Sequence, residues 1–179
     1  MHAAIQDCVK CPLGHTRTKF VFGDGNAKAK IVLIGEAPGE QEDLKGIPFI
    51  GRAGQLLERL LGEVGLKRTD VFICNTLKCR PPQNRAPLPT EIAECEPYLF
   101  QQLAIIRPKV VVCLGAPAAQ TILRTKASIG TLRGKLTDWL GMKVIPTYHP
   151  AFLLRPNGQP YVKTVTEDLR LAWQEASKN

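Results

Sequence analysis

The stretch KIVLIGEAPGEQEDLKGIPFIGRAGQLLERLL, residues 30–61, decides the fold and raises the question of function. Its apolar run ends at Gly35, and turn residues 36–39 and acidic or amide residues 40–43 follow before a clear helical pattern begins. A turn from a strand into a helix commonly uses Gly, Pro and a polar residue, so GEAPG by itself is compatible with a turn alone. The segment nevertheless combines a carboxylate, an exposed backbone and the ring of Phe49, which suggests a ligand.

Length and charge narrow the class of protein. The chain has 179 residues and a formal charge of +8, from 24 Lys and Arg against 16 Asp and Glu. A chain of this length buries about 70% of its unfolded surface, so we expect one domain, residues 1–179. A basic surface favours polyanions. No apolar run approaches the roughly 18 residues of a membrane helix and no leader pattern is present, so we expect a cytoplasmic, nucleoid-associated monomer without membrane contact.

Four short apolar runs are typical of buried parallel strands, which are continuously apolar rather than alternating. They occupy residues 31–34, 71–74, 110–114 and 144–147. Helical patterns separate these runs, and such alternation predicts a parallel sheet with helices on both faces. We therefore expect a single α/β domain with a central four-stranded parallel sheet.

The helical patterns lie within residues 56–64, 90–103, 116–123 and 165–176. Gly65 is placed to end the first helix, and Thr90 is the expected N-cap of the second. Pro97 predicts a kink or a break near the start of that second helix. The sequence PPQNRAPLP, residues 81–89, predicts a stiff irregular loop.

Polar residues follow the ends of the predicted strands. Because ligands bind beyond the carboxyl ends of parallel strands, Glu36, Asn75 and His149 should converge at one edge of the sheet. An Asn amide can accept from a ring N–H and donate to a carbonyl, while His can donate to an oxygen that gains negative charge. These properties suit a pyrimidine site, over which Phe49 could place its ring. Each residue alone also suits a turn, a buried histidine or a core aromatic, and their coincidence favours a site.

Signatures of three common enzyme classes are missing from the sequence. It contains no G-x-G-x-x-G, no G-x-x-x-x-G-K-[ST] and no G-x-S-x-G. A Rossmann dehydrogenase, a P-loop enzyme and an α/β-hydrolase are therefore not expected.

The six cysteines fall into two sets. Cys74 and Cys113 lie in predicted strands, where a free thiol is a small apolar side chain. The other four have the spacing C-x2-C-x67-C-x15-C and are Cys8, Cys11, Cys79 and Cys95. Four thiolates suit an iron-sulfur cluster or a structural zinc, and the spacing leaves both open. A thioredoxin-like role for CVKC does not fit, because no predicted strand leads into it.

The sequence resembles the family 4, iron-sulfur uracil-DNA glycosylases of prokaryotes. The resemblance covers nearly the whole chain and rests on CVKCPLG, GEAPGEQED, GIPFIGRAGQLL, CNTLKCRPPQNRAP, ECEPYL and YHPAFLLR in this order. It implies a small parallel sheet flanked by helices and an enzyme that removes uracil from DNA. It also implies a [4Fe-4S] cluster, held in a region formed by residues 8–11 and 79–95, with the ligands Cys8, Cys11, Cys79 and Cys95.

The resemblance assigns roles to the residues of the pocket. Phe49 would stack on uracil, Asn75 would read its N3–H and O4, and the backbone near Ala37 would contact the ring. His149 would stabilise the uracil anion at O2. Two acids complete the site. Glu36 would orient water or the sugar. Glu42 would border the C5 edge of uracil and help to exclude the methyl group of thymine. Better-known uracil glycosylases have an Asp at the position of Ala37, so no obvious general base is expected.

The DNA contacts implied by the resemblance lie just beyond His149. An enzyme of this class must flip the nucleotide out of the helix. Leu153 or Leu154 would fill the vacated stack, and Arg155 would hold a phosphate or the orphaned base. The cluster would order the basic residues around Lys78 and Arg80 against DNA. A sibling group traps DNA through a His in the loop that corresponds to residues 80–94, and this chain has no His there, so turnover is expected.

Two other functions remain open from the sequence. A non-catalytic iron-sulfur or zinc DNA-binding module would keep the fold and bind DNA without releasing uracil. A small-molecule enzyme could use the same strand-end pocket for a free nucleotide. Uracil release from a defined oligonucleotide separates the three.

Overall fold

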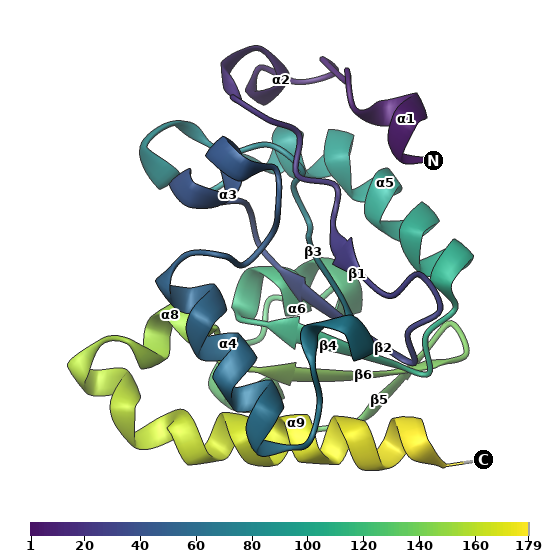
Figure 1. Cartoon of the computed structure of the whole chain (residues 1–179), viewed down its shortest axis with the longest axis vertical. Coiled ribbons are helices and arrows are strands. Elements are labelled where there is room, and N and C mark those ends of the chain that lie inside the picture. Colours follow the sequence, from purple (N-terminus) through teal and green to yellow (C-terminus); the bar gives the residue numbers. More distant parts are fainter. Residues whose placement is uncertain (179) are drawn as a thin grey trace.

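The computed structural model describes residues 1–178, and these contain one six-stranded sheet in the order β1-β3-β2-β4-β6-β5 (Figure 1). The strands are β1 (Asp24–Gly25), β2 (Ile31–Gly35), β3 (Phe72–Asn75), β4 (Val110–Leu114), β5 (Thr137–Trp139) and β6 (Met142–Thr147). The inner four pair in parallel, whereas β1 and β5 pair antiparallel with β3 and β6. Among the parallel strands, the chain forms β2 first, moves to β3 on one side and then crosses to β4 on the other. A ligand crevice is expected at the carboxyl ends of β2 and β4, where the direction of this progression reverses.

The expectation of a four-stranded sheet was incomplete. All four predicted strands form the parallel centre, but two antiparallel edge strands extend it to six. β1 has two residues and β5 has three, and none of these residues is fully buried. Apolar runs cannot reveal such strands, because short edge strands bury little of their surface.

The longer helices are α4 (Arg52–Glu63), α5 (Pro89–Ile106), α6 (Ala116–Leu123) and α9 (Val162–Ser177). Gly65 follows the end of α4 with a φ of 80°, as a helix-ending glycine should. Thr90 is not the N-cap of α5: the cap is Leu88, whose backbone N–H donates to the side chain of Glu91. Pro97 lies inside α5 without interrupting it. Among residues 1–178, none of the helices has both the length and the apolar character of a membrane-spanning segment.

The shorter helices mostly border the loops. They are α1 (His2–Ile5), α2 (Leu13–Thr16), α3 (Glu40–Lys45), η1 (Arg68–Asp70), η2 (Pro82–Asn84), α7 (Ile129–Leu132), α8 (Pro150–Leu153) and η3 (Pro156–Tyr161). Helix α3 was not predicted, because its six residues EQEDLK carry only one apolar side chain. Gly46 ends it in the left-handed conformation, with a φ of 77°.

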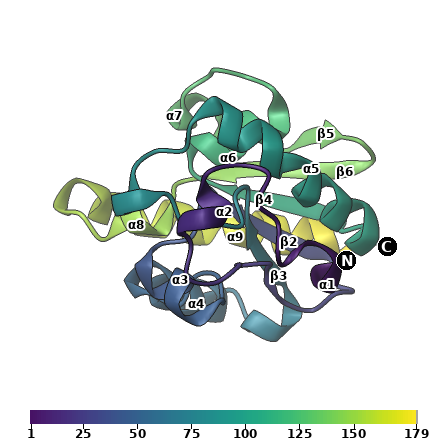
Figure 2. The ribbon, with the colours of Figure 1, turned by 90° about the horizontal axis from the view of Figure 1, so that it is seen from above.

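Helices α4 and α9 cover one face of the sheet, and α5 and α6 cover the other, as Figure 2 shows from above. On one face, Leu33 and Val112 pack against leucines of α4 and against α9. On the other, Val32 and Val111 pack against α5 and α6. Neighbouring residues of a strand point to opposite faces, so strands buried on both faces must be apolar throughout. This burial explains why β2 and β4 are continuous apolar runs.

The N-terminal segment forms a third, smaller core outside the sheet. Leu13, Leu77 and Tyr98 pack there with four of the six cysteines. In Figure 1 the purple N-terminal helices lie beyond the sheet, near α3 and the start of α5. This arrangement brings the start of the chain against the loop that follows β3.

Candidate functional site

A cavity of about 250 Å³ lies at the carboxyl ends of the central strands. Its lining residues are Ala37, Gly39, Glu42, Phe49, Ala53, Asn75, Asn84, His149 and Ala151. The cavity thus brings together side chains from the ends of β2, β3 and β6. Five of the residues predicted from the sequence line it, and Glu36 lines two neighbouring hollows that also include His149.

Asn75 is the last residue of β3 and is 2% exposed. Its Oδ1 atom is buried without any hydrogen-bond partner. Leaving a buried acceptor unpaired costs about 1–3 kcal/mol, so such atoms are rare unless a ligand satisfies them. The cavity next to this oxygen is therefore suited to a ligand with an N–H group.

Phe49 is held in an uncommon conformation beside Asn75. Its φ is 52°, in the left-handed region that residues other than glycine seldom adopt. Arg68 stabilises this turn by donating to the backbone oxygens of Phe49 and Pro48 and by pairing with Asp24 at 2.6 Å. The strained turn places a buried aromatic ring at the cavity wall, with its centroid 5.6 Å from the imidazole of His149.

His149 has a defined hydrogen-bonding state. It is the N-cap of α8, and its Nδ1 accepts from the backbone N–H of Ala151 at 3.0 Å. Burial lowers the pKa of His149 to about 4, although the nearby carboxylate of Glu42 opposes this shift. The imidazole is therefore neutral near pH 7 and carries its proton on Nε2, where it can donate to a ligand.

The two predicted acids lie in different places. Glu42, on α3, accepts from the backbone N–H groups of Ile50 and Gly51 at 2.9 and 2.8 Å, which fixes its carboxylate at the cavity wall. Glu36 lies outside the cavity and lines, together with His149, a neighbouring hollow; burial raises the pKa of its carboxyl group. Ala37 follows it and lines the cavity without a carboxylate, as its sequence implies.

Several lining residues were not predicted. Gly39, Ala53 and Ala151 are small residues that leave room for a ligand. Asn84 comes from the loop after β3, has a φ of 55° and accepts from Arg80 Nε at 2.7 Å. The proline-rich loop was recognised in the sequence, but no local signal indicates that its Asn turns towards the sheet.

The predicted wedge residues differ in exposure. Leu153 is completely buried in the core that contains α4 and α9, so it cannot enter a DNA stack from this conformation. Leu154 is half-buried and Arg155 is exposed. Of the two leucines predicted as alternatives for the wedge, Leu154 is therefore the accessible one in this structure, and the wedge itself stays a prediction.

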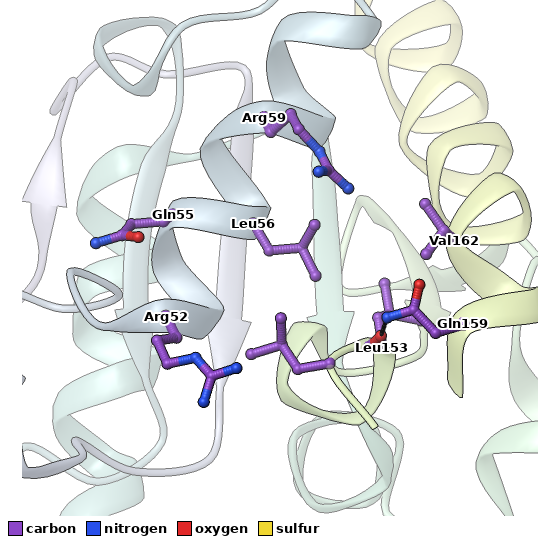
Figure 3. Close-up of a pocket in the computed structure, with 8 residues that line it drawn as sticks. Arg52, Gln55, Leu56, Arg59, Leu153, Gln159 and Val162 are labelled. Atoms are coloured by element: carbon purple, nitrogen blue, oxygen red, sulfur yellow. Dashed lines mark hydrogen bonds between the residues drawn. The ribbon is translucent and has the colours of Figure 1, made fainter. Parts of the chain in front are cut away.

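A groove of about 340 Å³ lies next to these residues, between α4 and the α8–η3 segment. Figure 3 shows Arg52 and Arg59 on α4 with Leu56 between them, and Leu153, Gln159 and Val162 opposite. We call this hollow the α4 groove. It has an apolar floor and two arginines. Arg59 forms a long, exposed ion pair with Glu63, with 3.9 Å between Nε and Oε1.

The four cysteines with the C-x2-C-x67-C-x15-C spacing share the small N-terminal core, while Cys74 and Cys113 lie in the sheet core. Burial raises the pKa of Cys79 to about 11, although a hydrogen bond from Arg17 opposes it. Within residues 1–178, no three His, Cys, Asp or Glu side chains are arranged to hold a metal ion. Three donors reach these sulfurs at 3.3 Å: Arg17 Nη1 to Cys79, Lys78 N to Cys95 and Tyr98 Oη to Cys8.

The predicted DNA-facing role of Lys78 was wrong. Lys78 is 0% exposed, and its Nζ donates to Asn75 O and to Gln102 Oε1 at 2.7 and 2.6 Å. Arg80 is partly buried and approaches Glu40 at 3.7 Å. A basic residue in the sequence indicates a charged surface only when the fold leaves it in solvent.

Comparison with known proteins shows the family to which the chain belongs. The family model of the uracil DNA glycosylase superfamily matches residues 22–174, which include every residue that lines the cavity. The chain is 49% identical to the type-4 uracil-DNA glycosylase of Thermotoga maritima over 94% of this chain and 88% of that protein. It is 51% identical to the type-4 enzyme of Archaeoglobus fulgidus, over 84% and 79%, and 46% identical to that of Saccharolobus solfataricus, over 93% and 80%.

Proposed function

Because the chain belongs to the uracil DNA glycosylase superfamily, we propose that it hydrolyses the bond between uracil and deoxyribose in DNA. The products are free uracil and an abasic site, as in the first step of base excision repair. The observation that carries this proposal is the buried, unpaired Oδ1 of Asn75 in a cavity that also contains Phe49 and His149.

Uracil offers what this cavity lacks. Its N3–H can donate to Asn75 Oδ1, while its O4 can accept from the amide nitrogen of the same side chain. Cytosine presents a lone pair at N3 and an amino group at position 4, so the same amide would meet the wrong partners. Phe49 stacks on the ring, and Glu42 borders its C5 edge, where the methyl group of thymine would lie. The backbone at Ala37 completes the contact with the base.

His149 acts on the leaving group. As the bond to the sugar breaks, negative charge develops on uracil, and a neutral imidazole with a proton on Nε2 can donate to O2. A donor aimed at such a charge typically contributes a factor of about 10² to 10³ in rate. Glu36 shares a hollow with His149, and from there its carboxylate can orient the attacking water or the sugar. Because Ala37 carries no carboxylate, stabilisation of the departing anion is the larger contribution.

We further propose a [4Fe-4S] cluster on the four cysteines of the N-terminal core, on the basis of their number and chemistry rather than of a preformed ligand arrangement. Cys8, Cys11, Cys79 and Cys95 supply a four-thiol donor set, and three of the sulfurs have hydrogen-bond donors of the kind that accompany cluster ligands. When bound, the cluster would join the N-terminal segment to the loop after β3 and to α5. We assign it a structural role in this region.

DNA lies across the edge that holds the cavity. Leu154, the half-buried leucine of the wedge, takes the place of the flipped nucleotide, while Arg155 contacts a phosphate or the orphaned base. The α4 groove receives the neighbouring part of the strand. Its arginines Arg52 and Arg59 suit phosphates, and its apolar floor suits a sugar or a base edge.

The decisive experiment is uracil release from a defined oligonucleotide, followed by alkaline cleavage of the abasic site. We expect cleavage at the uracil position and none in matched oligonucleotides with cytosine or thymine there. The variant His149→Ala should bind the same DNA but excise uracil about 10² to 10³ times more slowly in a single turnover.

Two results would contradict the proposal. DNA binding without uracil release would indicate a non-catalytic binding module, and release from a free nucleotide but not from DNA would indicate a small-molecule enzyme. A His149→Ala protein that excises at the wild-type rate would remove His149 from the chemistry and leave the activity itself established.

A further inference from the structure

Lys78 is the largest fully buried polar side chain among the residues that the structure describes. The Nζ atom donates two hydrogen bonds, both to neutral oxygens: the backbone oxygen of Asn75 and the side-chain Oε1 of Gln102. Gln102 is held in turn, because its Nε2 donates to the backbone oxygen of Phe22 at 2.8 Å. Burial of an amine is costly unless its hydrogen bonds are satisfied, so this side chain has a specific task.

The backbone of Lys78 is fixed as firmly as its side chain. Its N–H donates to Cys95 Sγ at 3.3 Å, and its carbonyl accepts from the N–H of Val21 at 2.8 Å. The residue therefore connects the cysteine core to the end of β3. Through its Nζ this connection reaches Asn75, which lies three positions earlier.

The end of β3 needs such support. The N–H groups of Thr76 and Leu77 bond to the backbone oxygens of Gly35 and Glu36, which ties the residues after the strand to β2. The carbonyl of Asn75 itself points to Lys78 Nζ at 2.7 Å. A shift of this peptide would move the Asn75 amide relative to the cavity, where a small misplacement can greatly reduce binding and rate.

We propose that Lys78 is a positioning residue for base recognition: its Nζ holds the Asn75 carbonyl and so aims the Asn75 amide at uracil. This inference rests on the proposed function of the cavity. It assigns Lys78 no contact with uracil or with DNA.

The test is a double-mutant cycle of Lys78→Met and Asn75→Ala. Methionine has nearly the same length as lysine and donates no hydrogen bond. The readouts are single-turnover excision, binding of free radiolabelled uracil by equilibrium dialysis, iron per chain and the visible spectrum. We expect Lys78→Met to keep its iron and spectrum but to bind uracil roughly 10- to 100-fold more weakly and to excise it more slowly by a similar factor.

The cycle separates positioning from general support of the fold. If Lys78 acts through Asn75, adding Lys78→Met to Asn75→Ala should change uracil binding by no more than about twofold. The inference would be overturned if the double variant lost uracil affinity by the product of the two single-variant factors. It would also be overturned if Lys78→Met bound uracil as tightly as the wild type. Loss of iron from Lys78→Met with uracil binding unchanged would overturn it as well. The surface variant Lys30→Met, at the opposite end of β2, is the matched control and should behave as wild type.

A second variant is informative even if Lys78→Met does not fold. Gln102→Leu removes the other acceptor of Nζ and leaves Asn75 and Lys78 unchanged, so we expect several-fold weaker uracil binding; wild-type binding by this variant would then overturn the inference. Free uracil can bind without turnover. A wild-type protein that binds uracil but does not release it from DNA would therefore refute the proposed function without refuting the role of Lys78.

Discussion

At the scale of the residue, His149 is defined by what its Nδ1 atom accepts. The bond from Ala151 N both caps α8 and fixes the neutral tautomer with a proton on Nε2. One contact thus sets local structure and chemistry together. Protonation of the ring would break this bond and place a charge against the wall of the cavity.

The low pKa of His149 predicts a loss of stability in mild acid. The pKa is about 4 in the folded protein and about 6.5 in an unfolded chain, so the unfolded state binds more protons between these values. The contribution is fully present above pH 6.5 and is lost as the pH falls towards 4. We expect the wild type to lose on the order of 1–2 kcal/mol from this residue between pH 7.5 and pH 5.

The measurement is urea unfolding at both pH values, compared with His149→Asn. Asparagine is a good N-cap, so this variant keeps an acceptor for Ala151 N and has no group that titrates at position 149. Its stability should fall less between the two pH values than that of the wild type. Equal falls would show that His149 titrates normally.

At the scale of the element, the end of β2 determines the space in the cavity. A Cβ atom on Gly35 would lie 2.4 Å from Asn75 Oδ1 and 2.6 Å from Phe49 Cζ. The glycine is needed because two recognition side chains approach the backbone there. The strand end and the strained turn at Phe49 therefore form one wall.

Gly35→Ala should damage recognition much more than folding. The methyl group must displace Asn75 and Phe49, so we expect excision to fall at least about 100-fold, while overpacking costs roughly 1–3 kcal/mol of stability. Gly62→Ala is the control, because nothing lies within 4 Å of its Cβ position in α4. It should gain up to about 1 kcal/mol and excise normally. Single-turnover rates and urea unfolding check both, and normal excision by Gly35→Ala would contradict the model of the wall.

At the scale of the whole molecule, the charge of +8 and the two arginines of the α4 groove both favour the binding of DNA. A chain with this excess of cations releases counterions when it binds DNA, whatever the sequence of the DNA. The groove would concentrate part of this effect next to the cavity.

Arg52→Ala and Arg59→Ala should each weaken DNA binding and reduce the slope of log K against log salt by about 1. Lys30→Ala, at the opposite end of the sheet, should leave the slope nearly unchanged. Binding titrations at several salt concentrations on an oligonucleotide without uracil give the slopes. Slopes that are unchanged in both arginine variants would place the strand elsewhere.

Substitutions in the two sets of cysteines should have different effects on iron content. Protein purified without air should contain about four iron atoms per chain. Cys8→Ala and Cys95→Ala should lose them, and the N-terminal segment should then become sensitive to proteases. Cys74→Ala and Cys113→Ala should keep the iron and lose only core packing. Iron and zinc analysis with limited proteolysis is the test; one zinc in an active, colourless protein would contradict the assignment.

The sequence by itself determined the centre of this molecule. Continuous apolar runs specified β2, β3, β4 and β6, because a strand buried on both faces has no polar positions. Ordered motifs at the strand ends then indicated Asn75, Phe49 and His149, since parallel strands deliver their carboxyl ends to one edge. Gly65 ended its helix as predicted, because a left-handed residue is a local requirement.

Only the tertiary structure decided features that depend on distant neighbours. The edge strands β1 and β5 are too short and too polar to stand out, and they exist because β3 and β6 offer unpaired edges. Lys78 lies in a polar stretch of the sequence that is typical of the surface, but its Nζ is buried and donates to one oxygen in β3 and one in α5. Leu153 turns inward because α4 and α9 complete its core. Such outcomes are set by contacts between segments far apart in the chain, which no local pattern of residues records.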